Sequence, residues 1–156
     1  MGALAFVIVC DGRPIFSEEL SGFRAFGSRR HSAATGANNK DSGASVAKEN
    51  DSRHLHQFVL HASLDVVSSH VWSSSAMHLK VVDSFNDMLV SAWRSAGGAM
   101  FLLLHEQQDD EGAKSFFRDV HDAYVCASLN PFFRRDAQLT SGSFNARVRA
   151  AAKRHL

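Results

Sequence analysis

The chain has 156 residues, of which 45% are hydrophobic, and this is enough to build one packed core. Its 17 basic and 16 acidic residues give a formal net charge of +1, so no overall field attracts nucleic acid or an anionic membrane. Two cysteines far apart in sequence, and the absence of any apolar run near the roughly 20 residues of a membrane span, argue against a disulfide-rich secreted domain and a transmembrane protein.

The first predicted elements are two strands joined by a tight turn. Apolar segments 4–10 and 15–20 flank Asp11-Gly12, a dipeptide that tolerates the positive φ of a hairpin turn. Residues 23–50 then contain mostly Ser, Gly, Ala, Asn and Lys, so burial cannot offset the chain entropy lost on ordering them. We therefore expect a hairpin and then a disordered loop, both within a single domain of residues 1–156.

A long helix with two apolar faces is predicted over residues 52–72. Asp51 or Ser52 can cap it, because either side-chain oxygen can accept a hydrogen bond from a free first-turn amide. At 100° per residue, its apolar residues form two stripes that lie nearly opposite each other. One stripe contains Leu55, Phe58, Val59, Ala62 and Val66, and the other contains Leu60, Leu64, Val67 and Val71.

The second of these stripes is the predicted partner surface. A helix that covers a sheet needs only one apolar side, and another would otherwise face water. We therefore predict that Leu60, Leu64, Val67 and Val71 bind a partner protein. Two alternatives stay open. The long loop or a strand edge folds over this stripe, or the opposite stripe is the exposed one, because periodicity does not fix which side meets the sheet.

Three strands and two helices are predicted after the long helix. They are strands 77–85, 88–93 and 100–105, a helix from Asp109 to the Asn130-Pro131 stop, and a last helix from about Ser143. Segments 6–9 and 100–104 lack polar alternation, which is typical of central strands covered on both faces. We expect Phe132-Phe133 to fold back and close the end of the sheet, with a docking role as the alternative.

No combination of residues carries the signature of a catalytic or metal site. Nine histidines invite a metal hypothesis that would use His54, His61 and His105, but no HExxH or CxxC spacing is present. The sequence also lacks GxSxG, GxxxxGK[ST] and GxGxxG motifs. We expect no enzymatic activity, no cofactor and no metal ion.

Several segments, taken together in their order and spacing, resemble the sedlin family. They are AFVIV, RHLHQFVLHASLDVV, HLKVVDSFNDMLVSAW, FLLLH and EGAKSFFRDVHDAYVCASLNPFF. No one segment is a catalytic signature, but their joint collinear arrangement is specific to the family. The similarity spans almost the whole chain except residues 23–50, where the connection is much longer than is usual in that family.

The resemblance implies an α/β (α+β) fold of the longin or profilin-like type. In this fold a five-stranded antiparallel sheet has the order 2-1-5-4-3, with the first long helix on one face and the last two helices on the other. The order places the first and fifth strands at the centre of the sheet, in agreement with their continuous apolar pattern.

The resemblance also implies a non-catalytic subunit of the TRAPP (trafficking protein particle) vesicle-tethering complex, which serves ER to Golgi transport and activates a Rab-family GTPase. The implied partners are other small subunits and larger complex-specific ones. The GTPase would be reached only through the complex, and the implied location is the cytoplasm, peripherally at ER to Golgi and Golgi membranes.

Asp65 is the single site residue that the resemblance implies, because the corresponding aspartate of the family is associated with complex assembly. Its alternative role is structural, as a carboxylate that bonds to a neighbouring loop or basic side chain. A regulatory longin domain of a SNARE or coat-adaptor protein is the second functional class. It is less favoured because no heptad segment for such a domain to fold back on follows it in this sequence.

Overall fold

The computed structural model describes residues 2–20 and 42–156, and of residues 42–50 it describes the backbone alone. The elements are β1 (Ala3–Cys10), β2 (Arg13–Glu19), α1 (Ser42–Ser73), β3 (His78–Phe85), β4 (Met88–Arg94), β5 (Met100–His105), α2 (Asp110–Ser128) and α3 (Gly142–His155). All neighbouring strands are antiparallel, and their order is β2-β1-β5-β4-β3. The predicted fold class and strand order are confirmed.

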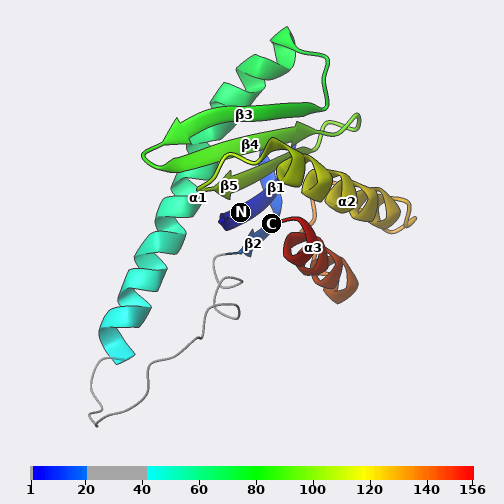
Figure 1. Cartoon of the computed structure of the whole chain (residues 1–156). Coiled ribbons are helices and arrows are strands. Elements are labelled where there is room, and N and C mark those ends of the chain that lie inside the picture. Colours follow the sequence, from blue (N-terminus) through cyan, green and yellow to red (C-terminus); the bar gives the residue numbers. More distant parts are fainter. Residues whose placement is uncertain (1, 21–41) are drawn as a thin grey trace.

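The molecule has three layers, with α1 on one face of the sheet and α2 and α3 on the other (Figure 1). Strand β1 contributes to both cores, because successive side chains of a strand point to opposite faces. Phe6, Ile8 and Cys10 belong to the core beneath α2 and α3, whereas Ala5, Val7 and Val9 belong to the core beneath α1. This double burial explains why β1 is apolar without alternation.

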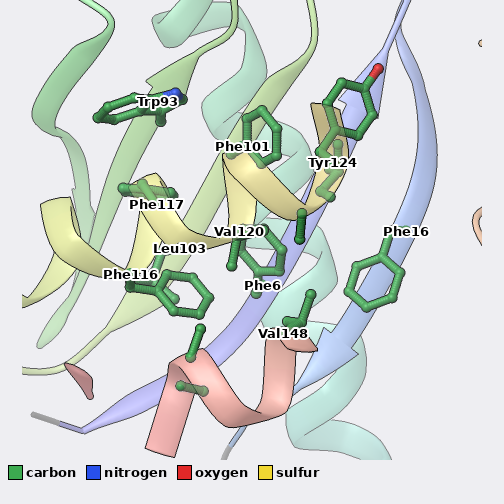
Figure 2. Packing of buried hydrophobic residues seen from close by; sticks show 14 of the residues in the cluster. Phe6, Phe16, Trp93, Phe101, Leu103, Phe116, Phe117, Val120, Tyr124 and Val148 are labelled. Carbon is green, nitrogen blue, oxygen red and sulfur yellow. The ribbon is translucent and has the colours of Figure 1, made fainter. Parts of the chain in front are cut away.

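Aromatic rings build the core between the sheet and helices α2 and α3 (Figure 2). The ring of Phe6 packs edge-on against Phe116, with centroids 5.2 Å apart, and lies 6.3 Å from Phe101. The ring of Phe144 on α3 packs edge-on against Phe16 on β2 at 5.1 Å. Because burial of each such side chain contributes about 1.5–3 kcal/mol, these contacts fix both helices on this face.

The turn between β1 and β2 forms where the sequence predicts it. Asp11 has φ 51° and Gly12 has φ 76°, both in the left-handed region. Glycine adopts this region without steric penalty, and aspartate is among the residues that tolerate it best. The predicted hairpin is confirmed.

Helix α1 begins at Ser42, so its predicted start near Ser52 and the loop prediction for residues 42–50 are wrong. That stretch contains two alanines, a lysine and a glutamate, all good helix formers. Extending an existing helix needs no new nucleation, so residues too polar to form a core can still be helical. Residues 23–41 lie outside the described residues, and for them the loop stays a prediction.

Candidate partner-binding surface on helix α1

The side of α1 that packs on the sheet is the stripe predicted to bind a partner. Leu60 and Val67 are only 3% and 1% exposed, within the aliphatic core formed with β1, β4 and β5. Leu64 and Val71 are half-buried and pack against the same core. The prediction that these four residues form a partner surface is wrong, because the sheet already covers them.

No signal in the sequence separates the two stripes of α1. At 100° per residue, Ser63 lies about as far from the middle of the row Leu60, Leu64, Val67 and Val71 as Asp65 lies from the middle of the opposite row. Val59, which periodicity assigns to the opposite stripe, is only 3% exposed and belongs to the same core as Leu60. Contacts with the sheet therefore decide which side of the helix is buried.

A buried hydroxyl also fixes the rotation of α1 against the sheet. The Ser63 hydroxyl is fully buried and donates to the Val59 carbonyl oxygen at 2.8 Å, and it lies 3.0 Å from Oδ2 of Asp83 on β3. Its bond to Val59 lies within α1 and would survive a rotation of the helix, but the contact with Asp83 on β3 would be lost. The opposite side of α1 must therefore face solvent.

The solvent-facing side of α1 carries apolar side chains that no described residue covers. Phe58 is 66% exposed and Trp72 is 91% exposed, and Leu55 and Ala62 are also exposed. At 100° per residue these side chains share one face with exposed Asp65. We call Leu55, Phe58, Ala62, Asp65 and Trp72 the outer stripe. Its aromatic residues match the composition of protein interfaces more closely than that of ordinary surface.

Asp65 is exposed at the middle of the outer stripe. Among the described residues, none donates a hydrogen bond to its carboxylate or forms an ion pair with it, although its backbone carbonyl accepts from Ser69 Oγ at 3.1 Å. The structural role considered for this carboxylate therefore has no partner in the described part of the chain. Its availability to another protein is the second geometric reason to regard the outer stripe as the candidate site.

The described histidines do not form a metal site. His54 and His61 are exposed on α1, whereas His105 is buried at the end of β5 beneath α2. In residues 2–20 and 51–156, no group of three or more His, Cys, Asp or Glu side chains is arranged to hold a metal ion. The cavity between α1 and strands β1 and β2 has a volume of about 130 Å³, below the roughly 300–1,000 Å³ of typical ligand pockets.

The sequence of this chain also matches a known protein family. The family model described as sedlin matches residues 8–154. The chain belongs to the sedlin family. The match spans both cores, the outer stripe and every element of the fold at least in part.

Several relatives align with this chain over most of their own length. A Schizosaccharomyces pombe protein named "Transport protein particle 20 kDa subunit" is 36% identical over 103 residues, covering 66% of this chain and 76% of the relative. Proteins named "Probable trafficking protein particle complex subunit 2" from Drosophila melanogaster and Caenorhabditis elegans are 37% and 36% identical, covering 70% and 73% of this chain and 78% and 82% of themselves.

Two further features of this sedlin-family chain bear on its surfaces. Of the predicted Phe132-Phe133 pair, Phe133 is half-buried against Tyr124 with ring centroids 5.9 Å apart, whereas Phe132 is 89% exposed. The expectation that both rings fold back is therefore right for Phe133 and wrong for Phe132. Among the described helices, none is both long and apolar enough to cross a membrane.

Proposed function

We propose that this protein is a non-catalytic subunit of the TRAPP vesicle-tethering complex and acts in vesicle-mediated transport by holding other subunits together. The observation that carries the proposal is the alignment, over most of their length, with relatives whose names describe subunits of a trafficking or transport protein particle. An exposed apolar stripe on a chain of this size is what a subunit of a stable assembly requires.

The proposed partners are other small TRAPP subunits and the larger subunits specific to one form of the complex. A Rab-family GTPase would be reached only through the assembled complex, and the exchange activity would belong to the complex. The protein would act from the cytoplasm at ER to Golgi and Golgi membranes, attached through its partners. The near-neutral net charge of +1 supports indirect attachment, because it gives little electrostatic affinity for anionic lipid.

Within this function, we place partner binding on the outer stripe with Asp65 at its centre. Phe58 and Trp72 offer large rings of the type that carries most of the energy in protein interfaces. Asp65 between them can form a charge-assisted hydrogen bond with a partner's arginine, lysine or backbone amide. Such a bond is stronger once the surrounding rings exclude water.

The test is purification of the tagged protein from cells, with the recovered subunits quantified by mass spectrometry. The wild-type chain should recover several small TRAPP subunits in near-equal amounts. Asp65→Lys and Phe58→Glu should each reduce recovery of at least one subunit by about tenfold or more, because they place an unpaired charge in the interface. Recovery of the chain alone under gentle conditions contradicts the whole proposal.

Two control variants distinguish loss of binding from loss of folding. Asp87→Lys makes the same charge reversal in the exposed turn between β3 and β4, and it should leave recovery unchanged. Leu60→Ala, on the buried side of α1, should lower the free energy of unfolding by about 2–5 kcal/mol. Phe58→Ala should change it by about 0.5 kcal/mol or less. If Asp65→Lys is destabilised as strongly as Leu60→Ala, the assignment of Asp65 to the interface is wrong.

A further inference from the structure

A groove lies on the other face of the molecule, where the end of α2, residues 129–141 and the start of α3 meet. Its volume is about 530 Å³, within the range of cavities that bind ligands or peptide side chains. The lining residues that matter here are Cys126, Phe132, Phe133, Arg134, Phe144 and Arg147. Helices α2 and α3 cover the face of the sheet opposite α1 (Figure 1), so this groove is separate from the outer stripe.

The segment that forms the groove is held in place at several points. The Phe132 amide donates to Asn130 Oδ1 at 3.0 Å, and the Leu139 amide donates to the Ile15 carbonyl of β2 at 2.8 Å. Between them, the Arg135 guanidinium donates to the Gly97 carbonyl oxygen. A groove fixed in this way loses little conformational entropy when it binds a ligand.

The groove is cationic as well as apolar. Its lining includes two arginines and no aspartate or glutamate. Among the described residues, no carboxylate forms an ion pair with exposed Arg147. Arg134 has a partner in Asp136 at 3.1 Å, but both side chains are exposed, and a pair of this kind contributes only about 0–1 kcal/mol. Both guanidinium groups are therefore open to an anionic ligand.

The apolar lining of the groove is exposed only in part. Phe133 and Phe144 form its inner wall, and on its rim Phe132 leaves nearly its whole ring in water. Leu129, which is also exposed, caps the end of α2 and directly precedes Asn130 of the groove lining. An aromatic ring beside exposed guanidinium groups suits a ligand that is apolar at one point and acidic at the next.

We propose that this groove binds a short acidic peptide segment of a partner protein. A bulky apolar side chain of the segment packs against Phe132 and Phe133, and flanking carboxylates pair with Arg147 and Arg134. The two arginines give a peptide enough charge for a directed contact, whereas nucleic acid would require a larger basic surface than this nearly neutral chain offers. The proposal does not depend on the function assigned to the outer stripe.

The test uses a displayed library of short random peptides, panned against the full chain at low ionic strength. The enriched peptides should combine aspartate or glutamate with a bulky apolar residue. They should bind the Arg147→Glu variant at least about tenfold more weakly, and Arg147→Gln with an intermediate loss. Arg118→Glu, at an exposed position of α2 outside the groove lining, is the charge-matched control and should bind them like the wild type.

Cys126 provides an independent readout, because it is exposed and lines the groove, whereas the second cysteine, Cys10, is buried. A saturating peptide should slow maleimide labelling of Cys126. Enriched peptides without acidic residues, equal binding to Arg147→Glu, or unchanged labelling of Cys126 would each overturn the proposal. Protection of Cys126 by self-association without peptide would also overturn it, and would identify the groove as a contact between copies of the chain.

Discussion

His105 shows how the surroundings of one residue decide its chemical role. Its Nδ1 lies 2.7 Å from the Gln107 carbonyl oxygen, which can only accept, so Nδ1 carries the proton. In the neutral ring Nε2 then accepts from the Ser91 hydroxyl at 2.8 Å. Burial lowers the pKa of His105 below its ordinary value of 6.5. Its imidazole therefore joins β4 and β5 as a neutral structural group.

The lowered pKa of His105 predicts how stability depends on pH. Below pH 6.5 the unfolded chain binds a proton at this residue that the folded protein does not yet bind. The stability that neutral His105 provides is therefore fully present above pH 6.5, and it is lost as the pH falls toward the lower pKa of the folded state. Above pH 6.5, His105→Gln should lower the free energy of unfolding by about 1 kcal/mol. Below pH 6.5, it should make the decrease of this free energy with falling pH less steep. Urea unfolding at several pH values measures both effects.

A second histidine with a lowered pKa and a control variant define how much of the pH dependence His105 should explain. Burial also lowers the pKa of His78. The loss of stability at acidic pH should therefore be smaller in His105→Gln than in the wild type, but it should not disappear. Exposed His54 lies outside both cores, and His54→Gln is the control for removing a histidine from the chain. A profile of His105→Gln that is as steep as that of the wild type would show that His105 does not contribute.

Single residues mark the limit of what the sequence predicts. Asp65 could be selected as a site residue only through the family resemblance, because its exposure depends on the rotation of α1. Phe132 and Phe133 are identical in type and adjacent, yet one is exposed and the other packs on Tyr124. Residues 130–133 form a turn in which the Phe133 amide donates to the Asn130 carbonyl oxygen at 2.9 Å, and residue type alone does not indicate which of the two adjacent rings packs inward.

At the scale of elements, α1 explains why the predicted partner surface was misplaced. Periodicity predicted two apolar stripes, but Val59 of the first stripe is buried with the second against the sheet, and the choice between the stripes depends on contacts with β1, β3 and β5. Ser63 and its contact with Asp83 could not be predicted, because the two residues lie on different elements. The start of α1 was also misplaced, since composition indicates whether a segment can build a core and not whether it can extend a helix.

The junction between α2 and α3 allows a prediction that reverses the usual helix propensities. Gly112 lies in the first turn of α2, where a Cβ would be 2.7 Å from Asp109 Oδ2 and 2.9 Å from the His155 carbonyl oxygen of α3. Alanine normally stabilises a helix by about 1 kcal/mol relative to glycine. Here Gly112→Ala should lower the unfolding free energy by about 1–3 kcal/mol, because the clash involves backbone.

Gly142 provides the matched control for this junction. It is the first residue of α3, and a Cβ there would meet no atom within 4 Å. Gly142→Ala should therefore be neutral or slightly stabilising in the same urea titration. If both alanine variants behave alike, the close approach of α3 to the start of α2 is not the reason for glycine at position 112.

At the scale of the whole molecule, the two cores share the central strands β1 and β5. Loss of either core should therefore destabilise the other, and unfolding should follow a single transition. Trp72→Phe removes the exposed one of the two tryptophans and leaves buried Trp93 as the fluorescence probe. Fluorescence of Trp93 and far-ultraviolet circular dichroism should then give the same denaturant midpoint. Two separated midpoints would show that α1 and the α2–α3 layer unfold independently.

The overall architecture was the part that the sequence predicted best. Continuous apolar runs identified the two central strands, Asp11-Gly12 identified the hairpin, and the element order ββαβββαα was correct. These features are local or repeat over many residues, so they remain readable without contacts. The groove beside Phe132 joins three segments of the chain, and its two arginines are separated in sequence by part of a loop and the start of α3. Such a site forms only when the chain folds, so the sequence alone does not predict it.

The side-chain sizes in β1 restrict how the length of this strand can change during evolution. Its large ring, Phe6, lies in the aromatic core, whereas the smaller Ala5 and Val7 lie beneath α1. Insertion or deletion of one residue near the start of β1 would exchange the two sets and bring the phenyl ring against α1. Sequences related to this one should therefore vary in length outside β1, and gaps in an alignment should avoid this strand.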